Sequence, residues 1–210
     1  MKIRWLGHCS FLITSDNGLR IITDPYENQM SLRWDDLDEE ADVATVSHEH
    51  FDHNNVAAIR GNPQVVRETT TIEGIGFKQI PTQHGADMGE NRVFIFEIDG
   101  IKLCHCGDIG NVLTDRQATS IGKVDVLFVP VGGTYTADAL SATKIYERLN
   151  ARIVIPMHFS CEKMQSEIIA TVDGFIEGKD NVIRIDSNEI DIRKEDLPGR
   201  TQILLMKSAN

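Results

Sequence analysis

Residues 47–54 read Ser-His-Glu-His-Phe-Asp-His-Asn, and this stretch places three of the chain's seven histidines within six residues. Imidazole and carboxylate side chains are the protein ligands of zinc, manganese and iron. The apolar run before the stretch is typical of a buried strand, and side chains two apart in an extended chain point the same way. His48 and His50 can therefore converge on one ion, while Asp52 and His53 follow as the chain turns and suit a second ion. The stretch predicts the core of a two-metal site.

Two other interpretations of this stretch can be weighed from the residues. A polar loop with incidental histidines is one alternative. A zincin motif is excluded, because it requires a histidine at position 52, where Asp52 stands.

The composition is that of a globular protein, and a chain of 210 residues can bury a substantial core. We expect a single domain over residues 1–210. The formal net charge of −11 argues against a nucleic acid or an anionic membrane held by a basic patch. The N-terminus has no long apolar run and the four cysteines show no disulfide spacing, so a cytoplasmic protein with reduced thiols is predicted.

Strand-like segments dominate the first half of the chain, and helical and strand-like segments alternate in the second half. Asp16-Asn17-Gly18 and Asp99-Gly100 are typical of hairpin turns. This order favours mixed β-sheets covered by helices, and two β-rich halves would form a sandwich of two sheets between helical layers. The predicted strands cover 2–6, 10–14, 20–23, 42–46, 64–67, 69–73, 76–80, 92–99, 101–106, 124–129, 152–156, 181–185 and 202–206. The predicted helices cover 54–60, 114–121, 136–149 and 161–175, with a further short helix in the acidic loop 29–40.

Three more candidate ligands stand directly after strand-like runs, where loops gather into a site. They are His84, Asp108 and His158. Each residue alone is weak evidence for a metal ligand, because a single histidine or aspartate at a strand end is more often a capping or hydrogen-bonding residue. Together with residues 47–54, they supply what a dinuclear site still lacks.

Over nearly its whole length the chain resembles the metallo-β-lactamase superfamily, and most closely its small single-domain branch, which includes ascorbate-phosphate-lactonase-like proteins. The hallmark His-x-His-x-Asp-His is complete at residues 48–53. Weaker matches are Gly7-His8 and Thr23-Asp24-Pro25 near the N-terminus. The later ligand positions match at His84, Gly107-Asp108 and Pro156-Met157-His158, and Pro130-Val131-Gly132-Gly133 matches as well.

The resemblance implies an α/β protein with an αββα four-layer sandwich: two mixed β-sheets flanked by helices, with metals at one edge. It implies two divalent metal ions, with zinc as the first candidate and manganese or iron as alternatives. One ion would be held by His48, His50 and His84, and the other by Asp52, His53 and His158. Asp108 would bridge the two ions, and Asp52 has a second role in orienting the nucleophile.

Several residues near these positions keep two interpretations. Asp24 is a candidate partner for a ligand histidine or a turn residue before Pro25. His8 and Tyr135 are candidates for lining the substrate pocket, although an ordinary loop explains Tyr135 equally well. His105 is expected to pack inside a strand, and Cys161 is expected to neighbour a helix start and not to act as a catalytic thiol.

The predicted function is a metal-dependent hydrolase in which two ions activate a hydroxide to attack a small ester, lactone or phosphodiester, with Asp52 and Asp108 as catalytic residues. The expected partner is a small-molecule substrate, with no nucleic acid and no membrane; the oligomeric state stays open. A di-iron oxidoreductase is an alternative, but the chain has no spare length for an electron-transfer module. A nuclease would need basic docking surfaces, and an inactive scaffold would be expected to lack ligands.

Overall fold

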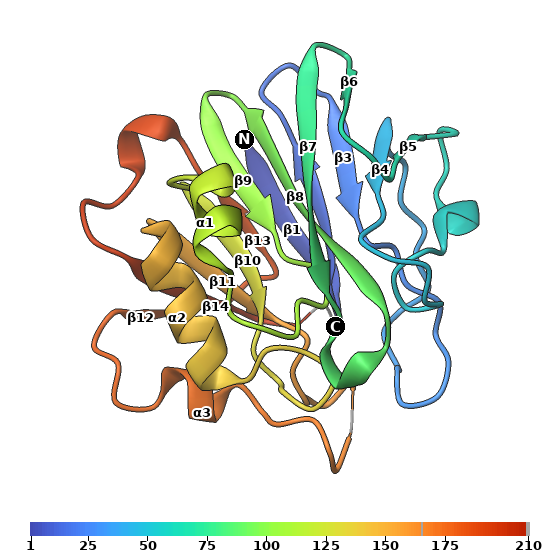
Figure 1. Ribbon diagram of the computed structural model, residues 1–210. Helices are drawn as coiled ribbons and strands as arrows, with labels where there is room; N and C mark the ends of the chain where they lie inside the picture. Colours follow the sequence, from blue (N-terminus) through green and yellow to red (C-terminus); the bar gives the residue numbers. More distant parts are fainter. Residues whose placement is uncertain (165, 209–210) are drawn as a thin grey trace.

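Two β-sheets packed face to face form the protein in the computed structural model, which describes residues 1–164 and 166–208 (Figure 1). The six-stranded sheet has the order β13-β1-β2-β3-β4-β5. Its strands are antiparallel from β13 to β3 and parallel from β3 to β5. The bounds are β1 (Lys2–Gly7), β2 (Ser10–Thr14), β3 (Arg20–Thr23), β4 (Val43–Thr45), β5 (Gln64–Val66) and β13 (Glu189–Asp191).

The eight-stranded sheet has the order β12-β14-β11-β10-β9-β8-β7-β6. It is parallel from β12 to β9 and antiparallel from β9 to β6. Asp99 and Gly100 join β8 to β9 with φ of 52° and 73°, the geometry of a tight hairpin turn, as predicted. The bounds are β6 (Thr70–Ile72), β7 (Ile75–Gln83), β8 (Glu90–Ile98), β9 (Ile101–His105), β10 (Val126–Pro130), β11 (Ile153–Met157), β12 (Val182–Ile185) and β14 (Gln202–Met206).

The core lies between the two sheets. Phe11 of β2 and Phe128 of β10 meet across it with ring centroids 4.5 Å apart. Both side chains are fully buried, as are all five residues of β10 and of β11. The continuous apolar runs of these parallel strands are therefore explained by burial on both faces.

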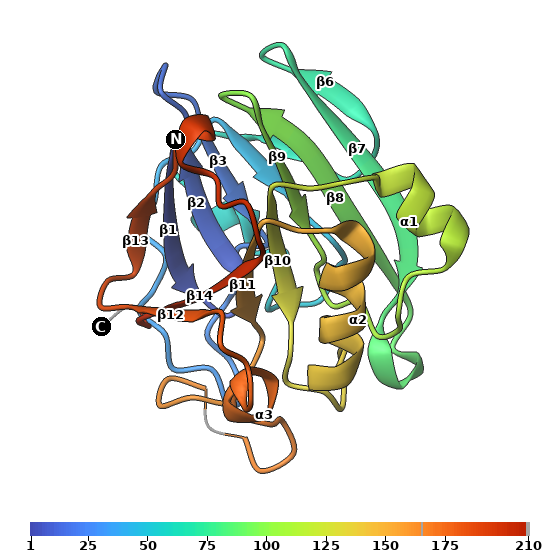
Figure 2. The same ribbon diagram turned by 90° about the vertical axis from the view of Figure 1, so that its left-hand side faces the viewer.

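Helices cover the outer face of the eight-stranded sheet (Figures 1 and 2). They are α1 (Asp115–Ile121), α2 (Ala139–Leu149) and the short α3 (Asp173–Ile176). Thr114 begins α1 with a capping box, and Asp138 caps α2 by accepting from the Ser141 N–H. The predicted α/β sandwich of two mixed sheets is confirmed.

The six-stranded sheet is covered differently on its outer face. The chain between β3 and β5 contains one short 3-10 turn, η1 (Val56–Ala58), and no α-helix. Arg4 on β1 forms an ion pair of 2.6 Å with Glu39 in this covering segment.

Three predicted helices differ from the structure. The helix predicted over 54–60 is only η1, and residues 29–40 contain no helix. Of the helix predicted over 161–175, the described residues are helical only from Asp173, and Gln165 lies outside them. Segments 29–40 and 161–175 instead pair with each other, through a bridge between Leu32 and Met164. This long-range pairing satisfies backbone groups that a local helix would have used.

All the predicted ligands lie on loops that meet at one end of the sandwich. The parallel arrangement of β9, β10 and β11 brings their carboxyl ends to this edge. The site residues lie after β1 (His8), β3 (Asp24), β4 (48–53), β7 (His84), β9 (Asp108) and β11 (His158).

Candidate metal centre

Asp108 lies at the middle of the site. Its Oδ2 atom is 3.1 Å from His84 Nε2 and 3.3 Å from the Nε2 atoms of His53 and His158. The Asp108 backbone N–H donates to Asn91 Oδ1, and the Cys9 thiol lies 3.6 Å from the other carboxylate oxygen. Burial acts to raise the pKa of Asp108, but the neighbouring imidazoles outweigh it and hold the pKa well below its usual range.

One histidine cluster lies on one side of Asp108 and consists of His48, His50 and His84. Their ligand nitrogens lie within 4.8 Å of one another, and His48 Nε2 is 3.0 Å from His50 Nδ1. The other ring nitrogens of two of them are held in place: His48 Nδ1 by Ser47 Oγ at 2.9 Å and His84 Nδ1 by the Gly85 carbonyl at 3.0 Å. His48 and His50 therefore converge as expected, although β4 ends at Thr45 and the convergence comes from a bend.

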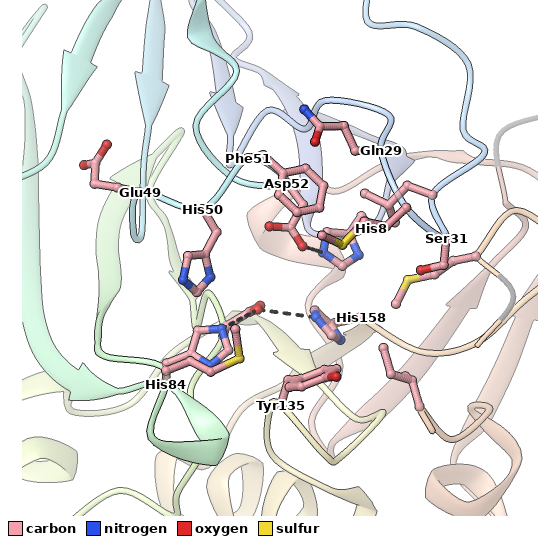
Figure 3. A pocket seen from close by; sticks show the side chains of 16 residues that line it. His8, Gln29, Ser31, Glu49, His50, Phe51, Asp52, His84, Tyr135 and His158 are labelled. Atoms are coloured by element: carbon pink, nitrogen blue, oxygen red, sulfur yellow. Dashed lines mark ion pairs between the residues drawn. The ribbon is translucent and has the colours of Figure 1, made fainter. Parts of the chain in front are cut away.

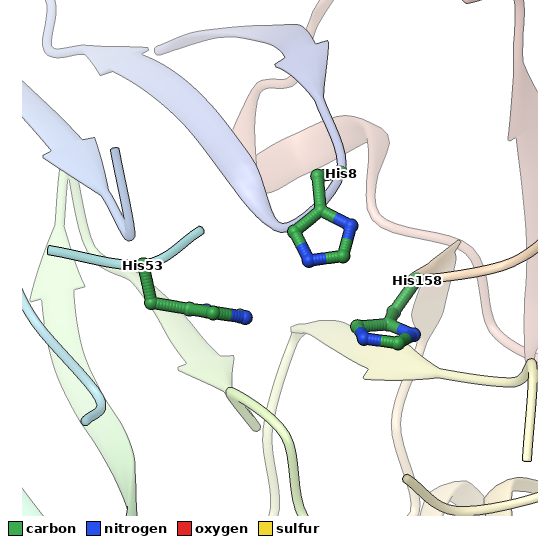
Figure 4. A group of neighbouring side chains, drawn as sticks. All are labelled: His8, His53 and His158. Atoms are coloured by element: carbon green, nitrogen blue, oxygen red, sulfur yellow. The ribbon is translucent and has the colours of Figure 1, made fainter. Parts of the chain in front are cut away.

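A second histidine cluster consists of His8, His53 and His158 (Figure 4). The His8 ring lies 4.4 Å from that of His158 and 5.1 Å from that of His53, measured between centroids. The sequence pointed to His8 only as a pocket residue, but the structure places it as a third imidazole of this cluster. His8 and His158 both have φ of 49°, the left-handed region, so the backbone is strained where these two side chains turn inward.

Asp52 lies between the clusters and the pocket. Its Oδ2 atom is 3.3 Å from His8 Nε2 and 3.9 Å from His53 Nε2. Burial acts to raise the pKa of Asp52, but the charge of His53 and the contact with His8 lower it below its usual range. One Asp52 oxygen also lies within 4.8 Å of ligand nitrogens of His48 and His53. Asp52 can therefore coordinate an ion on either side of Asp108.

Asp24 contacts the His53 ring nitrogen that faces away from Asp108. Its Oδ2 atom lies 2.9 Å from His53 Nδ1 and accepts a hydrogen bond from Ser47 Oγ, while Oδ1 accepts from the Ser47 N–H. The carboxylate is fully buried and its residue has φ of 37°. This contact leaves His53 Nε2 facing Asp108, which is how a carboxylate orients a metal-ligating histidine.

The donor set fits divalent cations. Among the described residues, His8 Nδ1 and His158 Nδ1 have no hydrogen-bond partner, and unpaired buried polar atoms are costly. His8 Nε2 and His53 Nε2 each face a carboxylate oxygen at 3.3 Å without the geometry of a hydrogen bond. Burial lowers the pKa of His48 to about 3, so its imidazole is neutral and able to coordinate. Imidazoles and carboxylates in this number suit zinc, manganese or iron.

A pocket of about 530 Å³ opens over the clusters and is lined by His8, Asp52, Asp108 and Tyr135 among others (Figure 3). The sequence hypothesis for Tyr135 as a pocket residue therefore agrees with its position. His105 and Cys161 are not among the residues that line this pocket. His105 Nε2 donates to the Cys9 carbonyl at 2.9 Å, which fits the packing role predicted for it.

Sequence reasoning missed two residues that hold the site together. Cys9 was treated only as a reduced thiol, and Asn91 was not considered. The Asn91 side chain donates to Thr82 Oγ1 and to the Cys106 carbonyl and accepts from Asp108 N–H. The adjacency of Cys9 to His8 was the only signal in the sequence, whereas nothing near Asn91 distinguishes it from a surface asparagine.

The site geometry and the sandwich define a metal-dependent hydrolase class, and comparison with known proteins agrees. A family described as "Beta-lactamase superfamily domain" matches residues 2–158. The chain belongs to this family.

Individual relatives are described as metal-dependent hydrolases. A UPF0173 metal-dependent hydrolase from Carboxydothermus hydrogenoformans is 29% identical over 195 residues, covering 76% of this chain and 85% of that protein. The crystal structure of a proposed zinc-dependent hydrolase of the metallo-β-lactamase superfamily from Thermotoga maritima has a TM-score of 0.84 and 36% identity, with 99% of each chain covered. The predicted class, a metal-dependent hydrolase of this superfamily, is confirmed.

A third neighbour shares the fold alone. CmlA, a diiron β-hydroxylase from Streptomyces venezuelae, is 14% identical with a TM-score of 0.60, over 81% of this chain and 47% of CmlA.

No helix of the described residues combines the length and the apolar character that crossing a bilayer requires.

Proposed function

We propose that the protein hydrolyses a small ester, lactone or phosphodiester with two divalent ions, zinc first, held on either side of Asp108. The observation that carries the proposal is the position of Asp108 Oδ2, within 3.3 Å of histidines from both clusters. A carboxylate so placed can bridge two ions, and the same edge of the sandwich opens to a pocket.

When bound, two such ions supply a water of lowered pKa and polarise the oxygen of the substrate. His48, His50 and His84 would hold one ion. His53 and His158 would hold the other, with Asp52 or His8 completing its ligands. Seven side chains thus surround Asp108 as candidate ligands, and replacing Asp52 and His8 one at a time tests which of the two completes the second ion's ligands.

Asp52 has a second task in this proposal. Its carboxylate lies on the wall of the pocket and keeps a pKa below the usual range, so it is an acceptor at neutral pH. There it would orient the attacking water through a hydrogen bond and take up its proton at Oδ2. Asp24 acts through His53 and fixes that imidazole with Nε2 turned toward the ions.

The di-iron oxidoreductase is the second candidate, because the same sandwich occurs in a diiron β-hydroxylase. Metal content after anaerobic purification, together with an oxygen-consumption assay, separates the two. Stoichiometric iron with oxygen turnover and no hydrolysis would overturn the hydrolase proposal.

The direct experiment is a screen of chromogenic esters, lactones and phosphodiesters on protein reconstituted with zinc, manganese or iron. Asp108→Ala and His50→Ala are expected to lower turnover at least 100-fold, since each removes a ligand. Asp186→Asn is the matched control, because this carboxylate is 96% exposed and pairs with Lys207, away from the candidate ligands. Full activity surviving in both ligand variants would refute the site.

A further inference from the structure

Apolar side chains from separate loops line the pocket over the metal-ligand residues (Figure 3). Phe51 comes from within the stretch 47–54, and the others come from the loops after β3, β7 and β11. These six apolar lining residues are Met30, Leu32, Phe51, Met88, Met164 and Ile169. Three of them are methionines, whose flexible thioethers adapt to apolar groups of varied shape.

Backbone pairing connects two of the loops that line the pocket. Leu32 and Met164 form a β-bridge, and the Arg33 N–H donates to the Lys163 carbonyl at 2.7 Å. Leu32 and Met164 are both buried. The loops after β3 and β11 are therefore joined where Leu32 and Met164 line the pocket, and these two side chains form a shared apolar wall.

The apolar surface continues outward from the pocket. Met30 is 79% exposed and Met88 44% exposed, and both line the pocket. Ile168, which is 57% exposed, directly precedes the lining residue Ile169. These three are half of the large exposed hydrophobic side chains of the described residues, and the two that line the pocket, Met30 and Met88, point to an apolar ligand.

Acidic side chains line the pocket. No lysine or arginine is among the described residues that line it, whereas Glu49, Asp52 and Asp108 are. Glu49 is paired with Arg67 at 3.0 Å, and Arg67 itself is not part of the lining. A phosphate or carboxylate on the non-reacting part of a substrate would therefore find no cationic side chain, and it would face carboxylates.

We propose that the substrate is a neutral carboxylic ester or lactone that carries a medium-length alkyl or aryl chain, and that this chain lies along Met30, Met88 and the Leu32–Met164 wall. This inference rests on the proposed hydrolytic function and names its substrate class. In the reaction, water adds to the carbonyl carbon and the carbonyl carbon–oxygen single bond breaks. The products are a carboxylic acid and an alcohol, joined in one molecule where the substrate is a lactone.

The first test compares γ-butyrolactone, γ-octalactone, γ-decalactone and a phosphorylated sugar lactone on the zinc-loaded protein. Each methylene buried in the pocket is expected to raise kcat/KM on the order of threefold to fourfold until the chain fills the wall. The phosphorylated lactone is expected to be the poorest substrate. A phosphorylated lactone that matches or exceeds γ-decalactone would overturn the assignment.

The second test changes the exposed apolar residues. Met30→Gln and Met88→Gln are expected to lower the ratio of kcat/KM for γ-decalactone to that for γ-butyrolactone about fivefold to tenfold each. Leu140→Gln is the matched control, because Leu140 is 62% exposed on α2 and does not line the pocket. The ratio is expected to stay at the wild-type value in this control, and an equal fall in all three variants would overturn the assignment.

A binding measurement separates failure of this inference from failure of the proposed function. The neutral fluorophore N-phenyl-1-naphthylamine is titrated into the zinc-loaded protein and displaced with 1-decanol. Binding that weakens in the two methionine variants, but not in Leu140→Gln, supports the apolar pocket even if no lactone is hydrolysed, and only the hydrolase proposal then fails. Lactone hydrolysis without chain-length dependence, and without binding of the fluorophore, overturns the substrate class and leaves the hydrolase standing.

Discussion

At the scale of single residues, Asp24 is the side chain on which the orientation of a ligand depends most directly. It accepts three hydrogen bonds, two from Ser47 and one from His53, and it has no exposed surface. Burial acts to raise the pKa of Asp24, but the hydrogen bond from His53 and the nearby imidazoles lower it overall. The carboxylate is therefore ionised at neutral pH and can only accept.

Asp24→Asn is expected to weaken metal binding about 10- to 100-fold, because the amide NH2 would face a donor in either orientation: His53 Nδ1 if it replaces Oδ2, or the Ser47 N–H if it replaces Oδ1. The backbone should tolerate the change, since asparagine adopts positive φ readily. Metal affinity is measured by competition with a chelating dye. Asp42→Asn is the control: Asp42 also accepts from a backbone N–H, that of Arg20, but lies away from the histidines. Equal metal affinity in Asp24→Asn and wild type would contradict the role.

His105 provides a pH-dependent prediction. Burial lowers the pKa of His105 below the ordinary value of 6.5, and both ring nitrogens are used: Nε2 donates to Cys9 and Nδ1 accepts from the Gly107 N–H. Between the lowered pKa and 6.5 the unfolded chain binds the proton and the folded chain does not. This histidine therefore makes stability fall as pH drops below about 6.5, and it has no such effect above that pH.

The measurement is the free energy of unfolding by urea, from pH 7.5 to 5.5, for wild type and His105→Gln with zinc present. The wild-type curve is expected to be steeper by up to about 1.4 kcal/mol per pH unit below pH 6.5. Other titrating groups contribute to both curves, so the difference isolates His105. Parallel curves would mean that the pKa of His105 is the same in the folded and the unfolded chain, and would contradict the lowered pKa.

At the scale of elements, the junction after β7 depends on a glycine. A Cβ on Gly85 would lie 2.0 Å from the carbonyl oxygen of Tyr135, so any side chain there must push two loops apart. Gly85→Ala is expected to lower the melting temperature by several degrees and to reduce bound metal, since His84 directly precedes it. Gly76→Ala within β7 is the control, because nothing lies within 4 Å of its Cβ position. Calorimetry and metal content together test this, and unchanged metal content in Gly85→Ala would contradict the link to His84.

The elements also show how far the sequence could predict the fold and the site. Strands and hairpins followed from local signals such as Asp99-Gly100, and each predicted strand has a counterpart. The pairing of Leu32 with Met164 could not be predicted, because residues more than 100 apart in sequence satisfy one another's backbone groups there. His8 was underestimated for the same reason: only the folded turn between β1 and β2 brings it to His53 and His158. The sequence did not predict the short strand β13.

At the scale of the whole molecule, the site concentrates buried polar groups that the sandwich alone does not satisfy. Six histidines and three aspartates meet at one edge of two otherwise apolar sheets. The formal net charge of −11 adds a general attraction for cations. We therefore expect bound ions to contribute to the stability of the fold as well as to the chemistry.

Chelation tests this coupling. Removing the ions with EDTA is expected to lower the melting temperature by roughly 8–16 °C, because a site filled at 1,000 times its Kd adds about 4 kcal/mol and each kcal/mol shifts Tm by about 2–4 °C in a protein of this size. Readdition of Zn²⁺ should restore the melting temperature. Asp186→Asn is expected to show the full wild-type shift, whereas His50→Ala should show a smaller one, since it retains the cluster of His8, His53 and His158. A melting temperature that does not respond to EDTA or to Zn²⁺ in wild type would mean that the histidine clusters are stable without ions, and the proposed metal centre would then be wrong.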